Sequence, residues 1–571
     1  MIHYYISYQL PHLHFVDITL KVENIQEHTT YLQLPAWRPG RYELGNFAKN
    51  IQRFTIENEQ GEGIPFRKIT KDRWEVDTEN QDTILVKYNY YAATLDAGSS
   101  WLDEEQLYLN FVNCMLYVEG RMEEPCQMHL DVPDDYVIAC SLPEVEKHTL
   151  EAKSFYQLAD SPMIASNRLT HWEYEVEDST FHVWFMGECA LDKEKFIDHF
   201  TAFTREQINL MGKFSDEDYH FLYQIMPTRF YHGVEHGNST VIALGPAEKV
   251  PADLYPDFVG VSSHELFHAW NIIRLRPAEM MPYDFTRENY FPTGFVAEGV
   301  TTYYGDLFLV RSGVFSKSQC FAEFNKLLKR HFDNSGRFNH SLVESSLDLW
   351  LDGYATGVPG RKVSIYVKGA LVSLILDLEL RKITNGQQSL DTFMQYLWEN
   401  FGKKEVGYTL GDLEKLVQTL SNNKLKGYFE NFIYGKIPLE DKINEVFHTV
   451  GCALQAQAPE TNAEKLFGFR VQEENGKLTI SLIAPQSPAE KHLAPNDELI
   501  AINGRKIDNN LHELMGNRSI IEVTFSRYQK IRTVTLESKG ATYFRQYTMQ
   551  QREDATTEEK ARFEQWLGCK W

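Results

Sequence analysis

Cysteine is scarce and unpatterned in this 571-residue chain. The seven cysteines are odd in number, and no two of them form a CxxC pair. We therefore expect no disulfide framework and a reducing compartment. Positive charge is also in deficit, because 80 acidic residues oppose 57 basic ones and the formal net charge is −23. Such a surface repels phosphate backbones and anionic lipids, so neither nucleic acid nor a membrane surface is an expected partner.

Long apolar runs are missing as well. The N-terminal segment lacks the charged start and the apolar core of a signal peptide. The longest apolar stretch, residues 369–376, ends at Asp377 and is far too short to span a bilayer. These features predict a cytoplasmic protein.

The composition is otherwise that of a globular protein, with 43% hydrophobic and 24% charged residues. At roughly 100–200 residues per domain, the length predicts three or four domains. Residues 16–23 (VDITLKVE) alternate apolar and polar side chains, as a half-buried strand does, and residues 181–185 repeat the pattern. We expect an N-terminal β domain, resembling a sandwich, over residues 1–185.

Longer helical patterns follow this region. They cover residues 193–214, 368–382 and 412–420. Residues 455–463 then have the polar composition of a linker. Short strand patterns resume after it, and the last thirty residues are polar and charged. Together, these patterns predict a multidomain α+β protein.

The segment VGVSSHELFHAWN (259–271) carries the clearest chemical pattern. His264 and His268 are four residues apart, so on a helix both imidazoles face one point. Glu265 lies beside them. In HExxH helices this arrangement supplies two zinc ligands and a carboxylate that accepts a proton from water. The alternative is a pair of ordinary surface histidines.

A catalytic zinc ion needs a third protein ligand and an open fourth position. Glu298 is the candidate, because its apolar neighbours Phe295, Val296 and Val300 favour a buried site. Spacing alone does not choose Glu298 over Glu279 or Glu288.

Three segments taken together resemble the zinc and glutamate segments of the glycyl aminopeptidase family. They are HELFHAWN, RLRPAEMMPYDFTRENY (274–290) and AEGVTTYYGDL (297–307). Members of this family are PDZ-bearing gluzincin metallopeptidases related to aminopeptidase N. The resemblance implies one Zn²⁺ per chain, with Glu298 as the third ligand. It also implies a catalytic domain over residues 186–455, with a thermolysin-like part and a helical part.

Two further segments resemble the same enzymes. YHGVEHGNST (231–240) is similar to the strand that places a glutamate beside the metal, which implies that Glu235 binds the substrate's α-ammonium group. Gly233 allows close approach of the backbone on that strand. SIYVKGALV (364–372) is similar to the Tyr-x-Lys-Gly helix, which implies that Tyr366 donates to the tetrahedral oxyanion.

The C-terminal part resembles a PDZ domain over residues 464–540, followed by a tail over residues 541–571. LFGF (466–469) and SPAEKHLAPNDELIAINGRKI (487–507) carry this resemblance. In such domains a partner's C-terminal peptide adds as an extra strand. The alternative is a docked domain that only shapes access to the active site. Residues 34–51, which include the turn WRPG, resemble the family's N-terminal domain, and we expect a structural role for them.

These observations together predict a zinc aminopeptidase that acts on peptides with small first residues, glycine or alanine. Glu265 would be the general base. One alternative is a zinc endopeptidase that recruits substrates through the PDZ domain. Another is a non-enzymatic PDZ scaffold with an inert zincin core.

Overall fold

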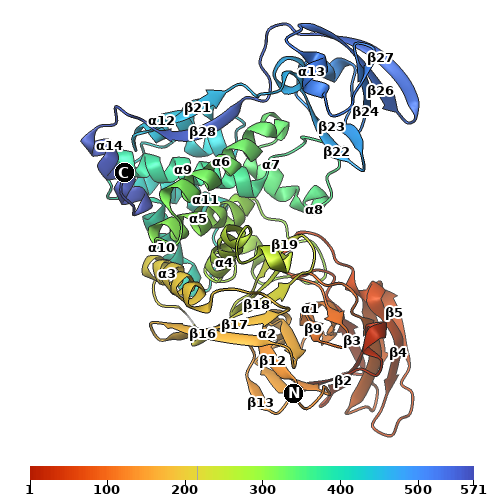
Figure 1. Ribbon diagram of the computed structural model, residues 1–571. Coiled ribbons are helices and arrows are strands. Elements are labelled where there is room, and N and C mark those ends of the chain that lie inside the picture. The colour runs from red at the N-terminus through yellow and green to blue at the C-terminus, as the bar shows by residue number, and fades with distance from the viewer. Residues whose placement is uncertain (215) are drawn as a thin grey trace. The chain divides into compact units, whose positions relative to one another are not determined.

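A computed structural model describes residues 1–214 and 216–571 (Figure 1). The chain divides into two compact units. The first unit comprises residues 1–316, 346–356 and 388–424, and the second comprises residues 317–345, 357–387 and 425–571. Among the described residues, no helix combines the length and apolar character that a bilayer crossing requires.

The first unit begins with a β-rich domain. One sheet has the strand order β13-β14-β11-β1-β2-β7-β4, a second β10-β3-β6-β5 and a third β12-β15-β9-β8. The strands are β1 (Ile2–Ser7), β2 (Phe15–Val22), β3 (Thr29–Gln33), β4 (Ile51–Glu57), β5 (Phe66–Thr70), β6 (Arg73–Asp77), β7 (Ile84–Tyr91), β8 (Trp101–Leu102), β9 (Leu107–Leu109), β10 (Tyr117–Val118), β11 (Cys126–Leu130), β12 (Val137–Cys140), β13 (Glu144–Glu146), β14 (Thr149–Ala152) and β15 (Met163–Ser166). On β2 the apolar side chains are buried and alternate with half-buried polar ones, as the sequence pattern predicts. The predicted N-terminal β domain is confirmed.

The next sheet supports the functional site. Its order is β16-β17-β18-β20-β19, with β17, β18 and β20 parallel and the two outer strands antiparallel to their neighbours. The strands are β16 (Thr170–Val176), β17 (Ser179–Met186), β18 (Asp218–Ile225), β19 (Phe230–Glu235) and β20 (Ser239–Gly245). The expected boundary at residue 185 falls inside this sheet, because β17 pairs with β18 along its whole length. Alternating side chains identify strands but do not show which sheet a strand joins.

Helices pack against this sheet. Asp192 caps α3 by accepting a hydrogen bond from the amide of Lys195, and the ring of Phe196 on α3 packs against Phe185 of β17. A π-helical segment, η5, leads directly into α5. The helices of this unit are α1 (Phe111–Cys114), α2 (Phe155–Ala159), α3 (Lys193–Met211), α4 (Tyr255–His268), η5 (Phe295–Val300), α5 (Thr301–Arg311), α8 (Leu349–Asp352), α10 (Leu390–Asn400) and α11 (Leu410–Leu420). The predicted helices over 193–214 and 412–420 are thereby confirmed.

The second unit contains a helical part built around α9. Nearly every side chain from Val367 to Arg381 on this helix is buried, as its apolar sequence predicts. The α-helices of this part are α6 (Lys317–Asp333), α7 (Leu342–Leu347), which ends just past the unit's boundary, α9 (Ile365–Ile383), α12 (Glu440–His448) and α14 (Thr557–Leu567). Two strands, β21 (Cys452–Gln457) and β28 (Gln546–Gln551), pair with each other. The expected linker at 455–463 therefore begins as a strand, and the expected tail contributes that strand's partner.

A PDZ-like region completes the second unit. Its sheet has the order β22-β23-β24-β26-β27, with β25 pairing to β24. The elements are β22 (Phe469–Glu474), β23 (Lys477–Ile483), β24 (Glu498–Ile502), β25 (Arg505–Lys506), α13 (Leu511–Met515), β26 (Ile520–Arg527) and β27 (Lys530–Glu537). Asn503 and Gly504 connect β24 to β25 with φ angles of 51° and 72°, as an Asn-Gly hairpin turn requires. The expected multidomain α+β class is thus confirmed.

The last helix is part of the second unit's core, which generates a stability prediction. Trp566 of α14 is fully buried, and its ring lies 5.7 Å from that of Phe324 on α6. Replacing Trp566 with alanine should lower the free energy of unfolding by about 3–5 kcal/mol, because a large cavity is left behind. Urea unfolding would measure the change. Tyr528, which is 94% exposed, is the control, and its alanine variant should stay within about 0.5 kcal/mol of wild type. Equal effects of both substitutions would contradict the packing of α14.

Candidate active site

Helix α4 brings two imidazoles together at its C-terminal end. The Nε2 atoms of His264 and His268 are 3.0 Å apart. The Nδ1 atom of His268 lies 2.9 Å from the carbonyl oxygen of Asn271. Donation from Nδ1 to this carbonyl leaves the Nε2 lone pair free for a metal ion. The HExxH segment therefore has the geometry of two ligands rather than of surface histidines.

Glu298 supplies the third potential ligand from the π-helical segment η5. Its Oε2 atom lies 3.5 Å from Nε2 of His268 and 3.9 Å from Nε2 of His264. The side chain is buried. Glu298, rather than Glu279 or Glu288, thus lies beside the histidine pair and completes a group of two imidazoles and one carboxylate.

Other side chains hold these three groups in place. The hydroxyl of Tyr42 donates to Oε1 of Glu298 at 2.8 Å, which leaves Oε2 directed at the histidines. The side-chain amide of Asn271 donates to the carbonyl of Val296 at 2.8 Å and to the hydroxyl of Thr301 at 3.0 Å. Asn271 therefore ties the segment after α4 to η5 and α5. Hydrogen bonds of this kind orient metal ligands and tune their basicity.

Two further carboxylates converge on the same place. Glu265 and Glu235 are both buried, and each offers an oxygen within 4.8 Å of a ring nitrogen of His268. The Oε2 atom of Glu265 is buried, and no described residue forms a hydrogen bond with it. A Cβ atom at Gly233 would lie only 2.1 Å from Oε1 of Glu265. Strand β19 therefore approaches Glu265 so closely that any larger residue at position 233 would displace this carboxylate.

The electrostatics of this cluster favour a positive charge at its centre. Burial raises the pKa of Glu265 well above its ordinary value and also raises the pKa of Glu235. Burial lowers the pKa of His264 to about 3. Although burial alone would lower the pKa of His268, the hydrogen bond to Glu298 and the nearby carboxylates outweigh it and raise that pKa to about 10. A proton or a metal ion at this position is therefore stabilised.

These donors fit a zinc ion. Two imidazole nitrogens and one carboxylate oxygen form the ligand set that catalytic zinc uses with an open fourth position. The unpartnered Oε2 of Glu265 lies beside this set, where it can accept a proton. The arrangement is suited to metal-assisted hydrolysis.

Sequence reasoning missed the contribution of the turn at residues 37–42. We expected a structural role, but Tyr42 bonds Glu298, and a Cβ atom at Gly40 would lie 2.8 Å from Oε2 of Glu235. Gly40 also has a φ of +77°, which few other residues adopt. The Trp-x-Pro-Gly-x-Tyr signature was the available signal, but it does not reveal what the turn touches.

Sequence reasoning also missed the contacts of the segment that follows Glu235. The Nδ1 atom of His236 lies 3.0 Å from Oδ1 of Asp160, and the amide of Gly237 donates to the other oxygen of Asp160. The Nε2 atom of His236 is buried with no partner. Asp160 thus fixes the end of the strand that carries Glu235. This pairing links residues 76 positions apart, so no local pattern predicts it.

Tyr366 lies in the first turn of α9, in the second unit, and is half-buried. Ser364 caps this helix by accepting a hydrogen bond from the amide of Val367. The role of Tyr366 at the oxyanion stays a prediction.

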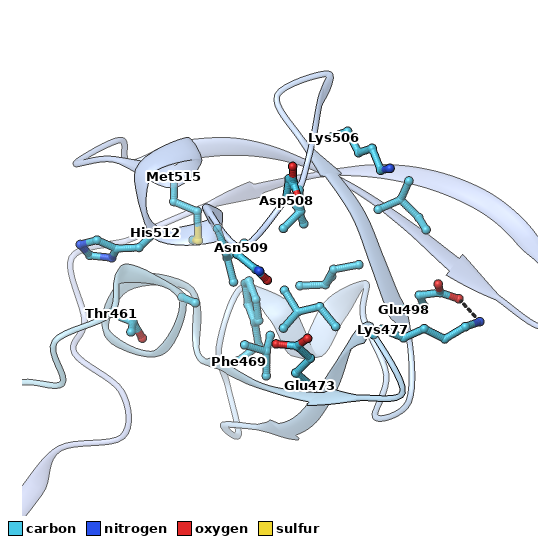
Figure 2. Close-up of a pocket in the computed structure, with 18 of the residues that line it drawn as sticks. Thr461, Phe469, Glu473, Lys477, Glu498, Lys506, Asp508, Asn509, His512 and Met515 are labelled. Atoms are coloured by element: carbon cyan, nitrogen blue, oxygen red, sulfur yellow. Dashed lines mark hydrogen bonds and ion pairs between the residues drawn. The ribbon is translucent and has the colours of Figure 1, made fainter.

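The PDZ-like region contains a groove of about 770 Å³ between β22 and α13. Figure 2 shows Phe469 of β22 and Met515 of α13 on opposite walls of this groove. The amide of Gly468, within the LFGF segment, donates to the carbonyl of Ala463. Lys477 and Glu498 form an ion pair of 3.0 Å at the rim (Figure 2).

Comparison with protein families gives three matches. The model of the peptidase M61 N-terminal domain matches residues 3–167, that of the M61 glycyl aminopeptidase matches residues 257–372, and that of the PDZ domain matches residues 457–515. The first match ends just before β16, in agreement with the position of that strand in the following sheet. No curated protein sequence matches the chain.

One solved structure shows the same architecture over nearly the whole chain. An aminopeptidase N family protein from Idiomarina loihiensis is 24% identical, with 99% of this chain and 100% of that chain covered and a TM-score of 0.91. An M1 zinc metallopeptidase from Deinococcus radiodurans is 14% identical, with 76% of this chain and 94% of that chain covered and a TM-score of 0.48. A mutant of the latter, bound to a Tyr-Ser-Ala substrate, has the same values.

The contact between Tyr42 and Glu298 generates a prediction. Replacing Tyr42 with phenylalanine removes the donor to Oε1, so zinc affinity should fall about 10–100-fold. Competition with a chromogenic chelator would measure this affinity. Tyr88→Phe is a matched control, because its buried phenol donates to the carbonyl of Cys114 instead. Unchanged affinity in Tyr42→Phe, or an equal loss in the control, would show that the contact does not support the metal site.

Proposed function

We propose that this chain, which belongs to the M61 family of metallopeptidases, is a zinc aminopeptidase that removes small first residues from peptides. One observation carries the proposal: the carboxylate of Glu235 is buried against the same histidine that Glu298 contacts. An anionic group fixed this close to the hydrolytic centre selects substrates by their free α-ammonium group.

The zinc ion would be held by His264, His268 and Glu298. When bound, zinc supplies Lewis acidity and lowers the pKa of water to about 7. Tyr42 and the carbonyl of Asn271 would keep the ligands in their binding orientation.

Glu265 would act as general base and then as general acid. Its unpartnered Oε2 atom accepts a proton from water during attack and returns it to the departing amine. Burial raises the pKa of Glu265, which strengthens it as a base. Gly233 leaves the space into which the Glu265 carboxylate fits.

Glu235 would bind the substrate's α-ammonium group and so place the first peptide bond next to Glu265. Gly40 leaves room for the Glu235 carboxylate, and Asp160 fixes the chain that follows it. Among the described residues, strand β19 pairs with β20 on one side, so its other edge can pair with the backbone of the substrate. Tyr366 would donate a hydrogen bond to the oxyanion.

The preference for glycine or alanine as first residue rests on the family resemblance. Location in the cytoplasm is likewise part of the proposal.

The PDZ domain would bind an extended peptide. Within the part of the chain that the structure describes, strand β22 pairs with β23 alone, so its other edge, which faces the groove, can accept an added strand. A partner's C-terminal segment is the proposed occupant.

The role of Glu265 is tested by Glu265→Gln. Turnover of alanyl-arylamide should fall by at least about 10³-fold, because the amide side chain no longer accepts a proton. The zinc ion held by His264, His268 and Glu298 should remain bound, as metal analysis would show. Glu288→Gln, another glutamate considered as a ligand, should keep wild-type turnover. Wild-type turnover in Glu265→Gln would overturn the general-base assignment.

The role of Glu235 is tested with glycyl- and alanyl-arylamides that have either a free or an acetylated N-terminus. Wild type should hydrolyse only the free forms, and a zinc chelator should abolish this activity. Glu235→Gln should raise KM for the free forms more than it lowers kcat, because the ammonium group loses its anionic partner. Hydrolysis of acetylated forms would instead indicate the endopeptidase.

A further inference from the structure

A second cluster of potential metal ligands lies on the sheet β16-β17-β18-β20-β19, away from the HExxH helix. His171 and Glu173 belong to β16, and His182 belongs to β17 directly opposite Glu173. The strands lie side by side in Figure 1. Their ligand atoms all lie within 4.8 Å of one another.

These three side chains share the outer face of the sheet. The alternate residues on the same strands, including Tyr174 and Phe181, are buried on the other face, where the ring of Tyr174 packs against Phe200 of α3. His171 and Glu173 are exposed, whereas His182 is half-buried. The cluster is therefore open to ions from solvent while its backbone is held in a paired sheet.

The spacing of the ligand atoms resembles that of the proposed catalytic centre. The Nε2 atom of His171 lies 3.1 Å from Nδ1 of His182, and Oε2 of Glu173 lies 3.8 Å from the same Nδ1. An ion about 2.1 Å from each nitrogen fits between them. At the HExxH helix the corresponding nitrogen–nitrogen distance is 3.0 Å, and the carboxylate oxygen lies 3.5 Å from the nearer nitrogen.

Neighbouring groups orient both histidines. The Nε2 atom of His182 lies 3.4 Å from Oδ1 of Asp218 on β18, which favours a proton on Nε2 and leaves the Nδ1 lone pair for a metal. The ring of His171 stacks on that of Trp184 with 3.8 Å between centroids. The indole of Trp184 in turn donates to Nδ1 of His220 at 3.2 Å. Because other side chains hold both rings in place, the pair is suited to bind a metal ion.

From this geometry we propose that His171, His182 and Glu173 form a second site for a divalent transition-metal ion, with Asp218 as the residue that orients His182. Two imidazole nitrogens and one carboxylate oxygen select zinc and similar ions over magnesium or calcium. The ion would join β16, the edge strand of this sheet, to β17 and so stabilise the edge.

The experiment counts zinc bound per full-length chain by equilibrium dialysis over a range of free zinc concentrations. Wild type should bind two equivalents, and the double variant His171→Gln/His182→Gln should bind one. The remaining equivalent shows that the variant is folded. His264→Gln should lose the other equivalent, so failure of the catalytic site and failure of the second site give different results.

The matched control is the pair His3 and His129. Their ring nitrogens are 3.2 Å apart, close to the spacing in the proposed site, but the described residues supply no third ligand. The variant His3→Gln/His129→Gln should keep two equivalents. The second equivalent should also raise the melting temperature of wild type but not that of His171→Gln/His182→Gln.

Two results would overturn the proposal. In the first, wild type and His171→Gln/His182→Gln bind the same number of zinc equivalents at every concentration. In the second, the equivalent is lost equally from the His3/His129 variant, which would mean that any adjacent histidine pair accounts for the binding.

Discussion

The burial of three carboxylates around one imidazole is the constraint on which the centre of this structure depends. Glu235, Glu265 and Glu298 surround His268 where little water reaches them. Buried negative charges of this density are stable only around a positive charge. The fold therefore builds a place for a cation, and each carboxylate can take a different role around it.

Glycines make this concentration of charge possible. Gly233 lies against Glu265 and Gly40 lies against Glu235, and neither position has room for a Cβ atom. Their effect is to let two backbones approach two carboxylates more closely than side chains would permit. Asn271 then holds the two ligand-bearing helices at a fixed separation through its bonds to Val296 and Thr301.

Much of this arrangement could be predicted from the sequence, because it depends on the spacing of residues that are close together in the chain. The four-residue interval of His264 and His268 fixes their common direction on a helix, and the alternation along residues 16–23 fixes the buried face of β2. The resemblance to a known family then distinguished Glu298 from Glu279 and Glu288, which spacing could not do. Local helix patterns also located α3 and α11.

Long-range partners could not be predicted in this way. The bond from Tyr42 to Glu298 joins residues 256 positions apart, and the pairing of β17 with β18 moves two strands out of the domain to which their pattern assigned them. In the same way, the polar segment after residue 540 contains a strand whose partner lies about a hundred residues earlier. Such contacts follow from the packing of whole domains, and no short window of sequence contains them.

The turn at residues 37–42 connects the N-terminal β domain to the buried carboxylates. It belongs to the N-terminal β domain, yet Tyr42 bonds Glu298 and Gly40 lies against Glu235 at the proposed catalytic centre. A fragment that starts after the β domain would retain the HExxH helix but would lack the hydroxyl that bonds Glu298. The two parts are therefore a single functional unit, and neither could be exchanged during evolution without a matching change in the other.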